Sequence, residues 1–308
     1  MMQMMKSKTK KSSHTIYVRL LCLIITLAMG VLTFCSCSSN VTSNQSSFAN
    51  NQNLVVHYLD VGQGDSIFVE LPNSQTMLID AGIKNEGEGI KNYISSLGYS
   101  SIDYLVATHP HADHIGSMAY VVENMNIGSI YMPKVSTTTK TYEKLLTAIS
   151  DKNLKIKSAH SGMSILNKDN LNVDILGPVT IDEDELNNCS VIIKIKYQNN
   201  KFLFIGDAEK DELSSVASDV SADVLKVGHH GSRTSTTKDF LERVNPKIAV
   251  ISVGKDNDYG HPHKKTINLL NEFDIETYRT DKDGTVTITS DETSIDTQTN
   301  GPSIEREN

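Results

Sequence analysis

Strand patterns and helix patterns alternate along this 308-residue chain from Leu54 onward, and this order limits its possible folds more than any other feature. Strand-like segments, apolar or alternating, lie at 54–59, 66–71, 76–79, 104–107, 171–176, 190–197, 201–205, 223–227, 248–253, 275–279 and 284–289. Helix-like segments lie at 88–97, 114–124, 140–150, 208–217, 236–244 and 264–273. Because hairpin-spaced strands precede helix-linked strands in both halves, the sequence predicts an α/β fold whose sheets are covered by helices on their outer faces.

The first 36 residues have the features of a secretion signal. They hold five basic and no acidic residues and include an apolar stretch from Leu20 to Phe34. That stretch is shorter than the roughly 20 residues of a membrane-spanning helix, and its length is typical of a signal peptide. It is followed by a small residue and Cys37, which resembles a bacterial lipoprotein cleavage site. We therefore expect a signal peptide over 1–36 and lipidation of Cys37. Lipidation of Cys35, plain secretion and an uncleaved anchor are the alternatives.

Composition and charge limit which fold and which functions are possible for the rest of the chain. The formal charge is −8, and without the leader 24 basic against 37 acidic residues leave about −13. Such acidity argues against non-specific coating of a polyanion. A hydrophobic content of 38% suffices for a sizeable core. We expect a flexible polar tether over 37–53, a folded domain over 54–290 and a frayed polar tail over 291–308.

Three histidines and an aspartate fall within six residues, in the order His109-Pro110-His111-Ala112-Asp113-His114. The segment follows an apolar strand pattern and precedes a helix pattern. Imidazole and carboxylate groups at this density suit borderline divalent metals. With only ten histidines in the chain, an incidental cluster of three is improbable. The sequence therefore predicts a metal site at this strand end.

This pattern resembles the metal motif of the metallo-β-lactamase superfamily. Three further pieces match that family in the expected order: Asp80 as a residue that supports the site from behind, Asp207 as the metal-bridging aspartate, and His229 or His230 as the late metal histidine. All follow apolar strands directly, where a packed sheet can hold ligands rigidly. The resemblance implies an αββα sandwich of two mixed β-sheets flanked by helices.

Within this superfamily, the chain resembles most specifically the ComEC type, the hydrolase domain of late-competence DNA-uptake proteins. It is carried by the motifs Leu59-Asp-Val-Gly-Gln-Gly-Asp-Ser66, Val227-Gly-His-His-Gly-Ser232 and Tyr259-Gly-His-Pro-His263. Together they extend over about residues 54 to 290. Since the chain has no second apolar stretch of spanning length, we expect a hydrolase domain without a membrane channel, held at the membrane only by its lipid.

The resemblance implies two divalent ions with a shared water. It assigns His109 and His111 to one ion, Asp113, His114 and His229 to the other, and Asp207 to both. Many family enzymes have a further histidine, where this chain has Asn187-Asn188-Cys189-Ser190. Because an amide oxygen from Asn188 is a weaker and harder ligand than imidazole, manganese is a candidate beside zinc. Cys189 is an alternative soft ligand, although a buried cysteine more often packs as a small apolar residue.

Asp113, Asp207 and His261 are the candidate catalytic residues. The resemblance places His261 against the scissile phosphate or the leaving group, with His230, Ser232 and His263 as candidates for supporting or substrate contacts. Cationic side chains near the motifs favour an anionic substrate and are expected to line the cleft: Lys226, Arg233, Lys238, Lys255, Lys264 and Lys265.

These features predict a secreted or surface-anchored metal-dependent hydrolase, most simply a phosphodiesterase or nuclease that acts on DNA or on a related phosphodiester. Hydrolysis of a teichoic-acid phosphocholine ester, a nucleotide or a lactam is the alternative within the same chemistry. A non-catalytic surface lipoprotein on the same fold is the alternative outside it.

Overall fold

The computed structural model describes residues 53–301. The predicted leader, Cys37 and the predicted tether up to residue 52 lie outside the described residues, as do residues 302–308. Among residues 53–301, no helix is both long enough and apolar enough to cross a lipid bilayer.

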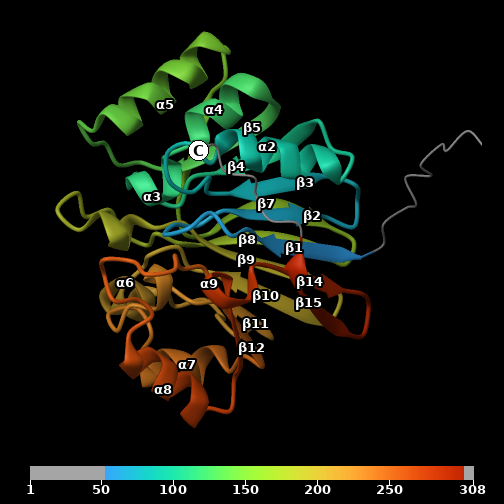
Figure 1. Ribbon diagram of the computed structural model, residues 1–308, viewed down its shortest axis with the longest axis vertical. Helices are drawn as coiled ribbons and strands as arrows, with labels where there is room; N and C mark the ends of the chain where they lie inside the picture. Colours follow the sequence, from blue (N-terminus) through green and yellow to red (C-terminus); the bar gives the residue numbers. More distant parts are fainter. Residues whose placement is uncertain (1–52, 302–308) are drawn as a thin grey trace, which may run out of the picture. The chain divides into compact units, whose positions relative to one another are not determined.

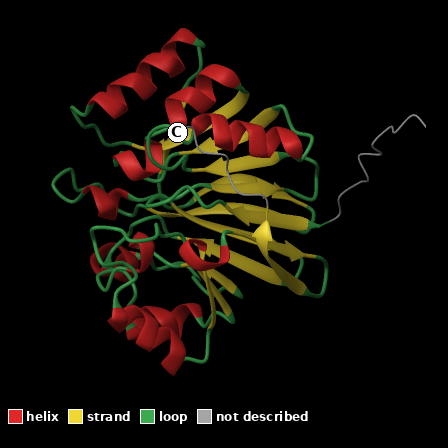
Figure 2. Ribbon diagram, viewed as in Figure 1, coloured by secondary structure: helices red, strands yellow, loops and turns green. Residues whose placement is uncertain are grey.

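Two mixed β-sheets pack face to face, and helices cover their outer faces, as Figures 1 and 2 show. The sequence prediction of an αββα sandwich is therefore confirmed. The first sheet has the order β15-β14-β1-β2-β3-β4-β5-β6 and the second has the order β13-β12-β11-β10-β9-β8-β7. The strands β3, β4, β5 and β6 are parallel to one another, as are β10, β11, β12 and β13, whereas the remaining pairs are antiparallel.

The strand bounds of the first sheet are β1 Leu54–Tyr58, β2 Ile67–Glu70, β3 Thr76–Ile79, β4 Ser101–Val106, β5 Asn126–Pro133, β6 Ile156–Ala159, β14 Thr285–Ser290 and β15 Ile295–Gly301. Those of the second sheet are β7 Met163–Lys168, β8 Leu171–Gly177, β9 Ile192–Tyr197, β10 Asn200–Phe204, β11 Val224–Lys226, β12 Ile248–Ile251 and β13 Glu276–Arg279. The helices are α2 Gly87–Ser96, α3 Ala112–Ile115, α4 Met118–Asn124, α5 Lys140–Asp151, α6 Lys210–Ser215, α7 Lys238–Val244, α8 Lys264–Glu272 and α9 Thr280–Asp283.

The sheets are buried on both faces, and β10 shows why its sequence is continuously apolar. Phe202 and Phe204 point into the core between the sheets, whereas Leu203 and Ile205 pack in the outer core beneath α6, α7 and α8. An equivalent outer core joins the first sheet to α2, α4 and α5. Each fully buried side chain of this size contributes roughly 1.5–3 kcal/mol, so the strand ends rest on a rigid base.

Four strands were not expected from the sequence. Strands β5, β6 and β7 lack a clean apolar or alternating pattern, because β5 contains Gly128 and Pro133 and much of β6 and β7 is exposed. The expectation of a frayed tail from residue 291 is wrong for Ile295–Gly301, which pairs antiparallel with β14. A polar edge strand is held by backbone hydrogen bonds to its neighbour, and these leave little trace in side-chain pattern.

Candidate metal centre and catalytic pocket

The histidine-rich segment His109–His114 occupies the end of the turn after β4 and the start of α3. His109 and His114 are fully buried, and the His109 ring lies 4.2 Å from the His114 ring and 4.6 Å from the His111 ring, centroid to centroid. His109 Nε2 and His111 Nδ1 are 3.0 Å apart. His111 and Asp113 are partly exposed. The sequence therefore brings three imidazoles to one strand end by local geometry alone.

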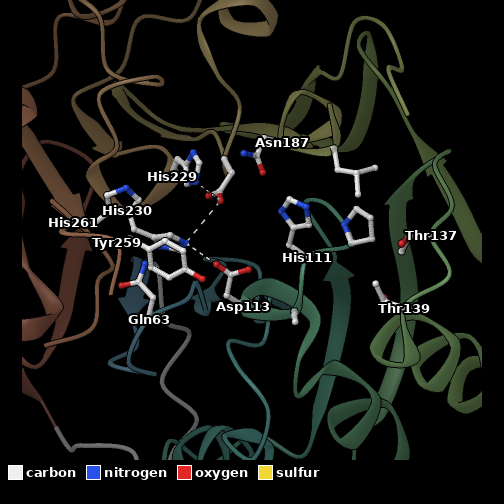
Figure 3. A pocket seen from close by; sticks show the side chains of 14 residues that line it. Gln63, His111, Asp113, Thr137, Thr139, Asn187, His229, His230, Tyr259 and His261 are labelled. Carbon is white, nitrogen blue, oxygen red and sulfur yellow. Dashed lines mark hydrogen bonds and ion pairs between the residues drawn. The ribbon is translucent and has the colours of Figure 1, made fainter. Parts of the chain in front are cut away.

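Two later loops bring a carboxylate and a histidine to the same point. Asp207 follows β10, and its Oδ2 lies 3.2 Å from His114 Nε2 and 3.9 Å from His109 Nε2. His230 follows β11, and its Nε2 lies 3.3 Å from Asp113 Oδ2 and 3.8 Å from Asp207 Oδ2 (Figure 3). Ligand atoms of Asp113, His114, Asp207 and His230 all lie within 4.8 Å of one another, which is close enough to share one ion.

The two adjacent histidines take different positions, and the structure reverses the preference for His229 as the ligand beside Asp113 and His114. It is the buried His230 that joins this group, with its Nδ1 held 3.0 Å from the Ser252 carbonyl oxygen. His229 is a quarter exposed; its Nδ1 lies 3.2 Å from Glu209 Oε1 and its Nε2 lies 3.8 Å from Asp207 Oδ2. Both have positive φ angles, of 49° and 51°. This left-handed turn, unfavourable for residues with a Cβ, directs both rings to one side.

Asp80 supports the site from behind, where the sequence analysis placed it. Its fully buried carboxylate accepts hydrogen bonds from the Thr108 backbone N–H at 2.8 Å and the Thr108 hydroxyl at 2.6 Å. It also lies 2.8 Å from His114 Nδ1, so that His114 Nε2 points toward Asp207. A carboxylate behind an imidazole fixes the ring orientation and the tautomer of a metal ligand.

A second support, Asp65, was missed by sequence reasoning. Its Oδ1 lies 3.3 Å from His230 Nδ1, and its Oδ2 lies 2.7 Å from Lys226 Nζ. Asp65 belongs to the Gly-Gln-Gly-Asp motif between β1 and β2, so the motif itself was the available signal. Lys226 was expected in a cationic cleft, but it is fully buried, and this expectation is wrong. As the last residue of β11, it points its ammonium group into the protein interior.

The electrostatics follow from burial and close opposite charges. Burial opposes ionisation of Asp65, but the Lys226 ammonium together with the His230 and His114 rings outweighs this effect and lowers the pKa of Asp65 to about 2. Burial likewise disfavours a charged His230, yet Asp207, Asp113 and Asp65 raise its pKa to about 10. Burial, followed by repulsion from the neighbouring His229, His263 and His230 rings, lowers the pKa of His261 to about 4, although Asp207 acts in the opposite direction. Without metal, His114 and His230 therefore favour their protonated forms, and a metal ion that binds these rings would displace the protons.

The donor set fits divalent metal ions. Among the described residues, His114 Nε2 and Asp207 Oδ1 are buried without a hydrogen-bond partner, at the centre of the cluster. Buried polar atoms without partners are costly in a folded protein, and a cation would satisfy both. A mixture of imidazole nitrogens and carboxylate oxygens suits zinc or manganese. His230, Asp113, His114 and Asp207 would hold one ion, and His109 and His111 with Asp207 a second.

Two residues that the sequence analysis placed in contact with metal or substrate, Asn188 and Ser232, do not line the cavity. Asn188 does not line the catalytic cavity: its Oδ1 accepts the Glu209 N–H at 3.0 Å, and its neighbour Asn187 lines the cavity instead. Ser232 is buried in the turn, with its hydroxyl 3.0 Å from the Thr234 hydroxyl, and it does not line the cavity either. Neither side chain is therefore placed to touch a substrate there.

His263 and Cys189, the other two candidate contacts, also make hydrogen bonds to neighbouring backbone groups. His263 accepts the Arg233 N–H at Nδ1, at 3.1 Å, and packs edge-on against His261, so it lies behind the cavity wall. Cys189 is buried, and its thiol lies 3.1 Å from the Asp182 carbonyl oxygen, to which it donates. The packing interpretation of Cys189 therefore holds, and the alternative of a soft ligand does not.

A cavity of about 550 Å³ opens over the cluster. It is lined by Gln63, Pro110, His111, Ala112, Asp113, Thr137, Thr139, Leu186, Asn187, Asp207, His229, His230, Tyr259 and His261 (Figure 3). No lysine or arginine is among these lining residues, so the expected cationic cleft is not present here. Arg233 and Lys265 line a neighbouring hollow beyond Glu209. An anion in the main cavity would therefore meet histidine side chains rather than lysine or arginine.

Comparisons with known proteins agree with the site. The model of the metallo-beta-lactamase superfamily matches residues 59–255. ComE operon protein 3 of Bacillus subtilis is 33% identical over 251 residues, covering 75% of this chain and 32% of that protein. Recombination protein 2 of Haemophilus influenzae is 28% identical over 224 residues, covering 71% of this chain and 26% of that protein. The chain thus spans about a third or less of the length of these relatives.

Among solved structures, CmlA, a diiron beta-hydroxylase from Streptomyces venezuelae, superposes with a TM-score of 0.51 at 16% identity. The match covers 73% of this chain and 52% of CmlA, and at this identity it shows the fold alone. The family model, the two mixed sheets and the histidine–aspartate cluster at their strand ends lead to the same conclusion. The chain belongs to the metallo-beta-lactamase superfamily and is similar, within it, to competence proteins of the ComEC type.

Proposed function

We propose that this protein is a metal-dependent phosphodiesterase that acts at the outer face of the cell membrane. The observation that carries the proposal is the cluster of Asp113, His114, Asp207 and His230, with two buried atoms left without hydrogen-bond partners at its centre. Two divalent ions there would lower the pKa of a water molecule between them and offset the negative charge that develops on a reacting phosphate.

The chain's own groups have separate tasks in this proposal. Asp113 is partly exposed to the cavity, so its free carboxylate face can accept a hydrogen bond from the attacking water and orient it. Asp80 and Asp65 hold the His114 and His230 rings in place from behind. His261 faces the cavity and is neutral near pH 7, because burial lowers its pKa. It therefore suits a hydrogen bond to the departing oxygen better than transfer of a stored proton.

A phosphodiester fits these features better than a lactam. The region between Asp113 and Asp207 offers Asn187 rather than the further histidine of many family enzymes, which favours harder, oxygen-rich metal sites. Two similar proteins, Recombination protein 2 of Haemophilus influenzae and Competence protein ComA of Neisseria gonorrhoeae, are named for recombination and competence. We therefore place DNA first among candidate phosphodiesters.

The test is a panel of metals and substrates. Purified protein should hydrolyse bis(p-nitrophenyl) phosphate with Mn²⁺ or Zn²⁺, and His111→Ala should reduce turnover by at least 100-fold. His160→Ala is the matched control, because His160 is an exposed histidine outside the cavity. The panel includes DNA, nucleotides, a phosphocholine ester and a lactam. Absence of metal binding in calorimetry would contradict every enzymatic version and leave a non-catalytic surface protein.

Surface attachment is proposed from the leader alone. Its apolar stretch and the following Cys37 favour a lipid anchor rather than free secretion. Cys37→Ala should move the protein from the membrane fraction to the medium. Unchanged membrane retention would indicate another anchor.

A further inference from the structure

Tyr259 is an exposed aromatic side chain in the wall of the catalytic cavity. It is 65% exposed, well above the exposure of Ile156, Val179 and Ile181, the other exposed large apolar residues in the described part of the chain. Figure 3 shows its ring beside Gln63 and Asp113, on the side of the cluster opposite His111. A single exposed aromatic ring is ordinary on a protein surface, but its position over the metal cluster calls for an explanation.

The loop that carries Tyr259 is tied down by one side chain. Asn257 Nδ2 donates to the carbonyl oxygens of Gly254 at 2.9 Å and His261 at 2.7 Å. Asn257 Oδ1 accepts the N–H groups of Tyr259 at 3.2 Å and His261 at 3.0 Å. Gly260 has a φ angle of 68°, which glycine adopts without strain. The backbone beneath Tyr259 is therefore held in one conformation.

The ring orientation of Tyr259 is also set. It stacks on His261, with the ring planes 22° apart and the centroids 5.7 Å apart. His261 in turn lies 5.5 Å from His229, centroid to centroid, and His229 Nε2 lies 3.8 Å from Asp207 Oδ2. Two stacked rings thus lead from the exposed edge of the cavity to the metal cluster. A planar group on Tyr259 would lie next to a phosphate bound at the cluster.

We propose that Tyr259 is a stacking platform for a nucleobase, so that the substrate class is a nucleoside-bearing phosphodiester. This inference rests on the proposed phosphodiesterase activity and names its substrate. Since no lysine or arginine lines the cavity, charge alone offers little selectivity for nucleic acid there. Stacking on an aromatic ring binds bases of any sequence and contributes about 1–3 kcal/mol per base.

The cavity wall at Tyr259 suits a nucleobase better than a choline group. Quaternary ammonium groups are bound by cages of several aromatic rings. Tyr259 is the only phenylalanine, tyrosine or tryptophan among the residues that line this cavity. One open ring face, backed by a stacked imidazole, offers a flat surface for one planar partner. The cavity volume of about 550 Å³ leaves room for a nucleotide unit.

The kinetic test compares thymidylyl-thymidine with an analogue that keeps the sugar-phosphate chain but lacks both bases. Tyr259→Ala should lower kcat/KM for the base-bearing substrate about 5- to 150-fold, the range that corresponds to one stacked base. It should leave the base-free analogue within twofold, and Tyr259→Phe should preserve both rates. Equal losses on both substrates, or no loss on either, would overturn the inference, as would a loss confined to a phosphocholine ester.

A binding test separates this inference from the proposed activity. The chain contains no tryptophan, so Tyr259→Trp introduces a single fluorescent reporter at the platform. Deoxyguanosine 5′-monophosphate should quench its emission saturably, and deoxyribose 5-phosphate should not. Quenching without any diester hydrolysis would refute the proposed function but keep the platform. Hydrolysis of DNA without base-dependent quenching would refute the platform alone.

Discussion

Lys226 Nζ lies 2.7 Å from Asp65 Oδ2, and both side chains are buried beneath the candidate metal ligands. Asp65 reaches His230 through its other oxygen, so the ion pair forms the base on which a candidate metal ligand rests. The backbone of Asp65 adds two further ties: its N–H donates to the Asp113 carbonyl oxygen, and its carbonyl oxygen accepts the Gly82 N–H. One residue of the β1–β2 loop thus joins the loops that carry both halves of the site.

Removing one partner of this pair should destabilise the fold strongly. Asp65→Asn leaves the Lys226 ammonium buried without its counter-charge, and such changes cost about 3–5 kcal/mol. Urea unfolding of metal-free protein measures the loss, and Asp65→Asn combined with Lys226→Met should recover part of it. The control is Lys247→Met, which breaks the exposed Lys247–Asp223 pair and should cost at most about 1 kcal/mol. Equal losses in the two single variants would show that burial of the ion pair is unimportant.

Acid should weaken the metal-free fold through Asp65. The pKa of this carboxyl is lowered from 3.8 to about 2 in the folded protein, because Lys226 favours its charged form against the opposing effect of burial. A folded-state pKa below the unfolded value adds stability above pH 4, and this stability is lost as the pH falls toward 2. Thermal unfolding temperatures recorded between pH 5 and 2 should therefore fall less steeply in the Asp65→Asn, Lys226→Met variant than in the natural protein.

His230 should hold metal more strongly than its neighbour His229. His230→Ala removes a buried ligand from the group with Asp113, His114 and Asp207, so calorimetry should show the loss of one metal equivalent. His229→Ala should keep that ion, because the His229 ring lies outside this group and is held by Glu209. Elemental analysis after dialysis checks the stoichiometry. The reverse outcome would return the ligand role to His229.

Gly64 should not tolerate a side chain. A Cβ at this position would overlap the carbonyl oxygen of Asp113, the residue that faces both the cavity and His230. Gly64→Ala must therefore push apart the β1–β2 loop and the start of α3, and small displacements of catalytic groups can reduce rates by about 100-fold. We expect turnover to fall by that order with far-ultraviolet circular dichroism unchanged. Full activity in the variant would mean that the Asp113 loop adapts freely.

The sequence predicted the parts of the fold that carry strong side-chain patterns. Strand β10 and helix α8 were expected close to their observed bounds, because burial of an apolar face imposes a period on the sequence. Edge elements such as β6 and β15 were not, since backbone pairing to a neighbouring strand holds them whatever their side chains are. Three of the four missed strands, β6, β7 and β15, are edge strands, and the fourth, β5, lies inside its sheet but contains Gly128 and Pro133.

The candidate site likewise has a part that the sequence predicted and a part that only the structure shows. The sequence by itself determined the local cluster of His109, His111, Asp113 and His114, since six consecutive residues at a strand end need no distant information to meet. Only the tertiary structure decided that His230 rather than His229 completes the group, and that Lys226 is buried against Asp65 instead of facing the cavity. Those choices depend on the backbone angles of one turn and on which face of β11 meets the β1–β2 loop. Both involve contacts between segments more than 100 residues apart in the sequence, of His230 with Asp113 and of Lys226 with Asp65.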